Sequence, residues 1–302
     1  MLQRPDILRY GDASGIEPHC ITPHRATPRL RTATRQGIAR EMKHKRPPHN
    51  RPSHPRRDDK DDGPVRLYGI HAVAAALANP ARAIGRLLLT DNAENRLATV
   101  VAQRAAKPQK VMPRELDRLL GADTVHQGAL LETEDLEEPT LEALAAACAT
   151  GGPLIVLDQV TDPHNVGAIL RSAAVLGASG LVMTRRHSPP LSGSLAKAAS
   201  GGLEVVPVAL IGNLARALEE LGDLGVRRIG LDGEGEATID GVGLSGAVAL
   251  VLGAEGKGLR RLTREGCDAL ARIPSAAAFG SLNVSNAAAV ALYAAARARG
   301  AT

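Results

Sequence analysis

The chain is poor in aromatic side chains, since its 302 residues include three tyrosines, one phenylalanine and no tryptophan. The core must therefore be built from aliphatic residues, and stacking of bases on aromatic rings cannot dominate any recognition of nucleic acid. Cysteine is also scarce. Cys20, Cys148 and Cys267 lie far apart and show no paired spacing. This usage favours a reducing cytoplasm, without disulfides or a metal site.

Long apolar runs are missing as well. No stretch approaches the roughly 18 apolar residues that a membrane span requires. No apolar signal-peptide segment follows Met1. We therefore expect no association with a membrane.

Positive charge is concentrated near the N-terminus. Residues 1–60 hold 14 Lys and Arg against 6 Asp and Glu, which is a net charge of +8, whereas the whole chain carries +5. Residues 1–62 are rich in Pro and His and have no apolar periodicity, which predicts a disordered basic tail. Such a tail suits a polyanion such as RNA, and a solvated tail without a partner is the alternative. Met42 is a second candidate for the start of translation.

Two units with regular apolar patterns follow the tail. Residues 63–138 alternate short strands with helices and predict a small α/β unit. Residues 139–152 form a linker with a helix over 141–150. Residues 153–302 again alternate strands and helices, which predicts a mostly parallel sheet covered by helices on both faces.

The glycine-rich stretch "LGAEGKG", residues 252–258, has the outline of a phosphate-binding loop. The Walker pattern would require a glycine where Val251 stands and a Ser or Thr where Gly258 stands. Glu255 would also repel a triphosphate. No G-x-G-x-x-G pattern follows the first strand of this unit, so an ordinary dinucleotide site is not supported. The glycines either let a ligand approach the backbone closely or only permit a tight turn.

Two further polar clusters flank predicted helices in the same unit. Asn165 fits a helix N-cap, and Arg171 lies six residues later within an otherwise apolar helix, on a different face. Ser281 and Asn283 precede an alanine-rich helix that either of them can cap. Helix capping, and for Arg171 a solvent-exposed charge, are the structural alternatives to a functional role.

Together these clusters resemble the three motifs of the SpoU (TrmH) family of RNA 2′-O-ribose methyltransferases, in the SPOUT superfamily. The motifs are N-x-G-x-x-x-R at 165–171, L-G-x-E-G-x-G at 252–258 and S-L-N-V-S at 281–285. In addition, "LYGIHAV" at 67–73 and "HQG" at 126–128 resemble the family's L30e-like substrate-binding domain. The pairing points to the branch that methylates a guanosine in 23S ribosomal RNA. Methylation of tRNA, and a non-catalytic role in rRNA assembly, are the alternatives.

The resemblance implies a catalytic domain over 153–302 with a deep trefoil knot that binds S-adenosyl-L-methionine, and it implies a homodimer. The cofactor contacts implied by family position are Leu252, Gly253, Gly256, Ile273 and Leu282. Arg171 is the residue to which the family assigns activation of the ribose hydroxyl. A guanidinium stays protonated far above neutral pH, so stabilising the emerging alkoxide is chemically easier for it than acting as a base. The residues implied to position Arg171, cofactor and ribose are Asn165, Glu255, Ser281 and Asn283. No metal is implied.

Overall fold

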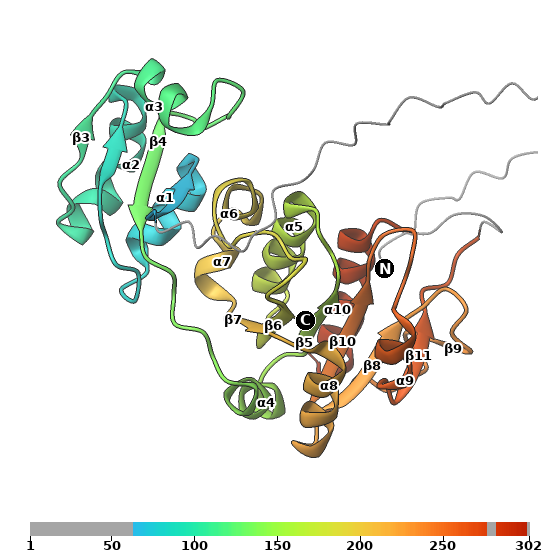
Figure 1. Cartoon of the computed structure of the whole chain (residues 1–302). Coiled ribbons are helices and arrows are strands. Elements are labelled where there is room, and N and C mark those ends of the chain that lie inside the picture. The colour runs from blue at the N-terminus through green and yellow to red at the C-terminus, as the bar shows by residue number, and fades with distance from the viewer. Residues whose placement is uncertain (1–62, 277–281, 301–302) are drawn as a thin grey trace, which may run out of the picture. The chain divides into compact units, whose positions relative to one another are not determined.

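Two β-sheets organise the part of the chain that the computed structural model describes, residues 63–276 and 282–300 (Figure 1). The predicted basic tail, residues 1–62, lies outside these residues. No helix in the described ranges is long and apolar enough to cross a membrane.

The first sheet has four strands in the order β1-β4-β2-β3. The strands are β1 (Val65–Tyr68), β2 (Leu87–Leu89), β3 (Gln109–Lys110) and β4 (Ala129–Thr133), and only the β2–β3 pair is parallel. The helices that accompany them are α1 (Ile70–Ala78), α2 (Asp91–Arg104) and α3 (Pro113–Leu120). Leu88 and Leu130 pack with Leu116 of α3, whereas Leu87 and Leu131 face the opposite side. This alternation is what the two-residue period of a strand requires.

The second sheet has seven strands in the order β7-β6-β5-β10-β8-β11-β9, and every pair is parallel. The prediction of an α/β fold with a mostly parallel sheet is confirmed. The strands are β5 (Leu154–Asp158), β6 (Gly180–Thr184), β7 (Val208–Ile211), β8 (Arg227–Leu231), β9 (Ala237–Thr238), β10 (Val248–Gly253) and β11 (Ala269–Arg272). The helices are α4 (Leu141–Thr150), α5 (Pro163–Val175), α6 (Gly193–Ala199), α7 (Gly202–Val205), α8 (Leu214–Asp223), α9 (Arg261–Glu265) and α10 (Val284–Ala298).

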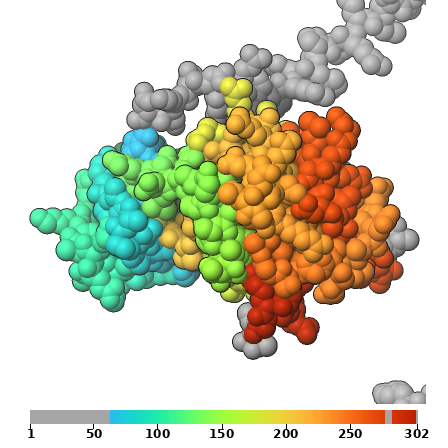
Figure 2. Space-filling model, turned by 90° about the horizontal axis from the view of Figure 1, so that it is seen from below, coloured from blue at the N-terminus to red at the C-terminus, as the bar shows by residue number. Residues whose placement is uncertain are grey.

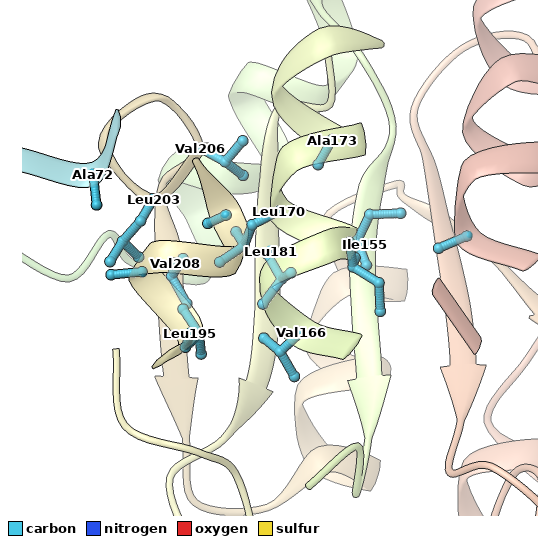
Figure 3. Packing of buried hydrophobic residues seen from close by; sticks show 14 of the residues in the cluster. Ala72, Ile155, Val166, Leu170, Ala173, Leu181, Leu195, Leu203, Val206 and Val208 are labelled. Atoms are coloured by element: carbon cyan, nitrogen blue, oxygen red, sulfur yellow. The ribbon is translucent and has the colours of Figure 1, made fainter. Parts of the chain in front are cut away.

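Helices cover both faces of this sheet. Ile155 and Leu157 of β5 belong to the apolar cluster on the side of α5, α6, α7 and α10. Figure 3 shows Ile155 beside α5. Leu154 and Val156 pack on the side of α4 and α8, which lie next to each other (Figures 1 and 2). The predicted linking helix over 141–150 is therefore also part of the helical layer on this sheet. Buried apolar side chains on both faces explain why the strands read as continuous apolar runs.

Small residues bring the helices on the first face close together. A side chain at Gly167 of α5 would lie 2.5 Å from the Cβ of Ala198 in α6, so no larger residue fits there. Helix α10 also packs on α5 and β10. Its buried side includes Ala288, Ala291 and Ala295, and alanine lets helix backbones approach closely. The aliphatic core expected from the composition is thus confirmed.

Candidate functional site

The site begins where the parallel neighbours β5 and β10 end. Asp158 and Gly253 are register partners at the carboxyl ends of these two strands. The loops that leave the strands therefore start side by side, at the edge of a parallel sheet where ligands commonly bind. One of them leads into α5, and the other is the glycine-rich loop that was predicted from the sequence.

Hydrogen bonds join the three sequence clusters at this edge. Asn283 donates from Nδ2 to Oδ1 of Asn165 over 3.0 Å. Asn165 in turn donates from Nδ2 to Oε2 of Glu255 over 3.4 Å. Oδ1 of Asn283 also accepts from the backbone N–H and the hydroxyl of Ser285, at 2.9 and 2.6 Å. Three segments that are far apart in the chain thus form one polar network.

The capping interpretations have different outcomes for the two asparagines. Asn283 is the N-cap of α10, so it caps a helix and also contacts Asn165. Asn165 is not an N-cap. The cap of α5 is Asp162, whose carboxylate accepts from the backbone N–H of His164, and Pro163 occupies the first helical position. Asn165 therefore lies in the first turn, and its side chain is left to bond to the other two motifs.

The glycine-rich loop returns tightly on itself. The backbone N–H of Gly258 donates to the carbonyl of Ala254 over 2.8 Å. A Cβ at Gly253 would lie 2.1 Å from the carbonyl carbon of Gly258, so the returning chain crosses directly over Gly253. Gly256 and Gly258 adopt φ of 75° and 66°, a region that favours glycine, and the space beside both is open. The carboxylate of Glu255 is exposed on this loop.

Arg171 is not part of this hydrogen-bonded network. It lies on the exposed surface of α5, about 9 Å further along the helix axis than Asn165. Its guanidinium forms no hydrogen bond or ion pair with any other residue in the described ranges. The backbone near it is closely packed, because a Cβ at Gly202 would lie 3.0 Å from the Arg171 nitrogen. Ser281, the remaining predicted side chain, lies outside the described residues.

The predicted cofactor residues occupy different positions around the sheet edge. Leu252 is buried in β10, immediately before Gly253. Leu282 precedes Asn283 and is half-exposed. Ile273 follows β11, which is separated from β10 by β8, and its side chain lines a surface pocket beside α10. Leu252, Gly253 and Gly256 therefore belong to one loop, whereas Ile273 approaches from a strand further along the sheet.

Two charged residues at this edge were not predicted from the sequence. Asp158 is completely buried, and its Oδ1 accepts from Nε of Arg260 over 2.6 Å. Its Oδ2 accepts from the backbone N–H of Arg260 over 2.9 Å. An aspartate that ends an apolar strand, and an arginine directly after a glycine-rich loop, were the available signals.

Other charged or reactive side chains lie outside this network. Arg185 binds Glu138 through both of its terminal nitrogens, at 2.9 and 2.7 Å. Lys197 is half-buried on α6 and forms no ion pair with another described residue. Within the described ranges, no group of three or more His, Cys, Asp or Glu side chains could hold a metal ion. Burial raises the pKa of the Cys267 thiol to about 12.

Both folded units of the chain match known protein families. Residues 152–293 match the SpoU rRNA Methylase family. Residues 66–139 match the family described as RNA 2′-O ribose methyltransferase substrate binding.

Individual relatives match over most of their length. The chain is 39% identical over 241 residues to the 23S rRNA (guanosine-2′-O-)-methyltransferase RlmB of Pseudomonas putida, covering 78% of this chain and 96% of that protein. The RlmB of Ralstonia nicotianae is 40% identical, with 77% and 95% covered. Among solved structures, the SpoU methyltransferase AviRb from Streptomyces viridochromogenes in complex with AdoMet has a TM-score of 0.67 at 21% identity, over 80% and 92% of the two chains. At that identity the match concerns the fold alone.

Proposed function

This chain belongs to the SpoU rRNA methylase family, and from that membership we propose that it transfers a methyl group from S-adenosyl-L-methionine to a ribose 2′-hydroxyl of RNA. One observation in the structure supports the proposal most strongly. The hydrogen-bonded chain from Glu255 through Asn165 to Asn283 joins the three motifs that the sequence carries at separate places.

The proposed substrate is a guanosine of 23S ribosomal RNA. RlmB relatives at 37% to 40% identity support this assignment, because the match extends over more than nine-tenths of their length. It therefore includes both the unit matching the substrate-binding family and the unit matching the methylase family. Transfer RNA remains the second candidate substrate. A non-catalytic rRNA-binding factor is disfavoured, because Asn165, Arg171, Glu255 and Asn283 are all present.

The proposed division of labour follows the two sheets. Residues 63–138 bind the RNA substrate, and residues 153–302 bind the cofactor and carry out the transfer. Residues 139–152 connect these two units. The basic tail at 1–62 adds contacts to RNA phosphates. Such contacts weaken as salt rises, because binding releases counterions from the RNA. Measuring RNA affinity over a series of salt concentrations, for the full chain and for a protein starting at Met42, tests this role of the tail. Equal slopes of affinity against salt for the two proteins would contradict it.

The residues at the sheet edge fit S-adenosyl-L-methionine. The loop around Gly253 and Gly256 presents backbone rather than bulky side chains, and the space beside Gly256 is open. Leu282 adds a half-exposed apolar surface. We propose that Leu252, Gly253, Gly256, Ile273 and Leu282 hold the cofactor, mainly through backbone and apolar contacts. When bound, the cofactor supplies an activated methyl group.

The side chains then have to orient the ribose and stabilise the charge that develops on its oxygen. We assign charge stabilisation to Arg171, because its guanidinium is exposed and has no partner among the described residues. Asn165, Glu255 and Asn283 hold one another in place and position the ribose. Ser281 is assigned to the same positioning group from the family motif. The proton of the hydroxyl leaves to solvent or to an RNA phosphate close to Arg171.

We further propose a homodimer that works in the cytoplasm, and a trefoil knot in the catalytic domain. Val290 and Tyr293 support the dimer, since they leave 39% and 56% of their surfaces exposed on α10. They line a pocket of about 600 Å³. An exposed apolar surface of this kind is typical of a protein interface. Sedimentation equilibrium measures the mass directly, and a monomer at micromolar concentration would contradict the dimer.

Mapping of 2′-O-methylation in RNA from a deletion strain tests the reaction and its target together. Loss of one methylated guanosine in 23S ribosomal RNA is the expected result. Loss of a tRNA methylation instead would favour the second candidate, and no change in any RNA would favour the non-catalytic one. In parallel, Arg171→Ala should abolish methyl transfer in vitro while cofactor binding persists. Full activity of that variant would contradict the role assigned to Arg171.

A further inference from the structure

Asp158 and Arg260 form an unusual pair at the base of the glycine-rich loop. The carboxylate of Asp158 is completely buried at the end of β5, and it accepts from both the Nε and the backbone N–H of Arg260. The two residues are 102 positions apart. A buried carboxylate is costly unless it is paired and hydrogen-bonded, and an ion pair adds little net stability when one partner stays in water, as Arg260 does with 47% of its side chain exposed. Stability alone is therefore a weak explanation for this pair.

The position of the pair indicates what it holds. The loop leaves the sheet after Gly253, whose register partner is Asp158, and it returns over Gly253 before reaching Arg260. Pairing of β10 with β5 fixes the outgoing end of the loop, and the carboxylate fixes the returning end. With both ends held against β5, the residues between them have fewer accessible conformations.

The same carboxylate also lies at the start of the other wall of the site. Gln159, the next residue, has a φ of 57°, and there the chain turns toward α5 and Asn165. Asp158 thus links two segments of the site. One segment leads from Asp158 to Asn165, and the other leads from Glu255 to Arg260, which is hydrogen-bonded to Asp158.

We propose that Asp158 and Arg260 are positioning residues that hold the 253–258 loop in its ligand-binding shape before S-adenosyl-L-methionine arrives. This inference rests on the proposed function for the identity of the ligand. Neither residue is assigned to the reacting atoms. Preforming a loop removes an ordering cost from the binding step, so its loss weakens affinity more than the rate of the bound complex.

The test uses Arg260→Ala in the full chain, with cofactor affinity measured by calorimetry and methyl transfer measured on RNA. The dissociation constant and the KM for S-adenosyl-L-methionine should each rise about tenfold, while kcat at saturating cofactor stays within about twofold. Arg260→Lys retains a positive donor and should recover part of the affinity. Should Arg260→Ala fail to fold, Arg260→Lys carries the test alone, with a smaller increase.

A matched control exists in the same sheet. Arg228 donates from its backbone N–H and from Nε to Oδ2 of Asp268, at 2.7 and 2.9 Å, so it uses the same two donors away from the loop, toward a carboxylate that is 36% exposed. Arg228→Ala should lower the melting temperature without changing cofactor affinity. If Arg260→Ala lowers the melting temperature equally and leaves the affinity unchanged, the positioning role is wrong.

Hydrogen exchange separates this inference from the proposed function. In the unliganded protein, amides of the 253–260 segment should exchange faster in Arg260→Ala than in the wild type, and Arg228→Ala should leave them unchanged. Faster exchange in a protein whose wild type binds no S-adenosyl-L-methionine would contradict the proposed function but retain the loop restraint. Unchanged exchange, in a wild type that binds the cofactor, would overturn the inference alone.

Discussion

Replacing Asn165 should separate the stability of the catalytic unit from its activity. Asn165→Ala removes the 3.0 Å bond from Asn283 and the 3.4 Å bond to Glu255. A neutral hydrogen bond contributes about 1 kcal/mol net, and the longer bond to an exposed carboxylate contributes little. The free energy of unfolding should therefore fall by about 1 kcal/mol, which lowers the melting temperature by about 2 to 4 °C.

The effect on the reaction should be larger than the effect on stability. Without Asn165, the side chains of Asn283 and Glu255 lose their common restraint, and a misplacement of about 1 Å can reduce a rate about a hundredfold. We therefore expect kcat to fall by about tenfold to a hundredfold. The assay is transfer of a tritiated methyl group to RNA, with urea unfolding measured on the same preparation.

Asn165→Asp distinguishes the two hydrogen bonds. A carboxylate at this position still accepts from Asn283, but it faces Glu255 with like charge. Two like charges about 4 Å apart repel by about 1 kcal/mol in water, and salt screens that repulsion. Relative to the wild type at the same salt concentration, Asn165→Asp should therefore regain activity as salt rises, and also when it is combined with Glu255→Gln, whereas Asn165→Ala should not.

The control for both variants is Asn286→Ala, which removes an exposed asparagine from α10, the helix that Asn283 caps. It should leave kcat and the free energy of unfolding unchanged. If Asn165→Ala keeps the wild-type kcat, or loses no more activity than Asn286→Ala, the polar network does not organise the site.

Three further predictions concern the loop, the thiol and the ion pair. Gly253→Ala should abolish cofactor binding or folding, because its Cβ would lie 2.1 Å from backbone, whereas Gly256→Ala faces open space and costs only about 1 kcal/mol for its positive φ; chemical unfolding and calorimetry compare them. Cys267, whose pKa is raised by burial to about 12, should react with iodoacetamide at pH 8 roughly a thousandfold more slowly than a free cysteine, and rapid labelling at Cys267 of the native protein, mapped by mass spectrometry, would contradict that raised pKa. The hydrogen bond from Arg228 lowers the pKa of Asp268, so that pair stabilises the fold above the unfolded-state pKa and loses this contribution as pH falls through the folded value. Melting temperatures of the wild type and Asp268→Asn should accordingly differ at pH 7 and converge as the pH falls below the folded-state pKa of Asp268, and a difference that does not change with pH would contradict the assignment.

The sequence predicted which residues come together at the site better than it predicted the local backbone structure around them. The three motifs indicated that Asn165, Glu255 and Asn283 belong together, and the structure joins them. The N-cap interpretation of Asn165 was wrong, because Asp162 and Pro163 provide an earlier helix start. Arg171 was grouped with these residues, but the structure does not bring it into contact with them.

The short helices and the contacts between residues far apart in the chain could not be predicted from the sequence. Helices α7 and α9 have four and five residues, too few for an apolar period to be visible. The Asp158–Arg260 pair depends on the register of β5 and β10, because only that register brings a strand end against the return of the loop. Both faces of β5 and β10 are buried, so their sequences are continuously apolar and show no alternation that would fix the register.

The polar network of Asn283, Asn165 and Glu255 has a consequence for the order of folding events during synthesis of the chain. Asn283 binds Asn165 across 118 residues, and Glu255 binds it across 90. Contacts this distant cannot form while the later segment is still being made, and closing such long loops is slow. A nascent chain can therefore pair β5 with β6 and dock α5 long before it can hold a ribose. Catalytic competence should appear abruptly, once α10 has emerged and docked, rather than grow with chain length.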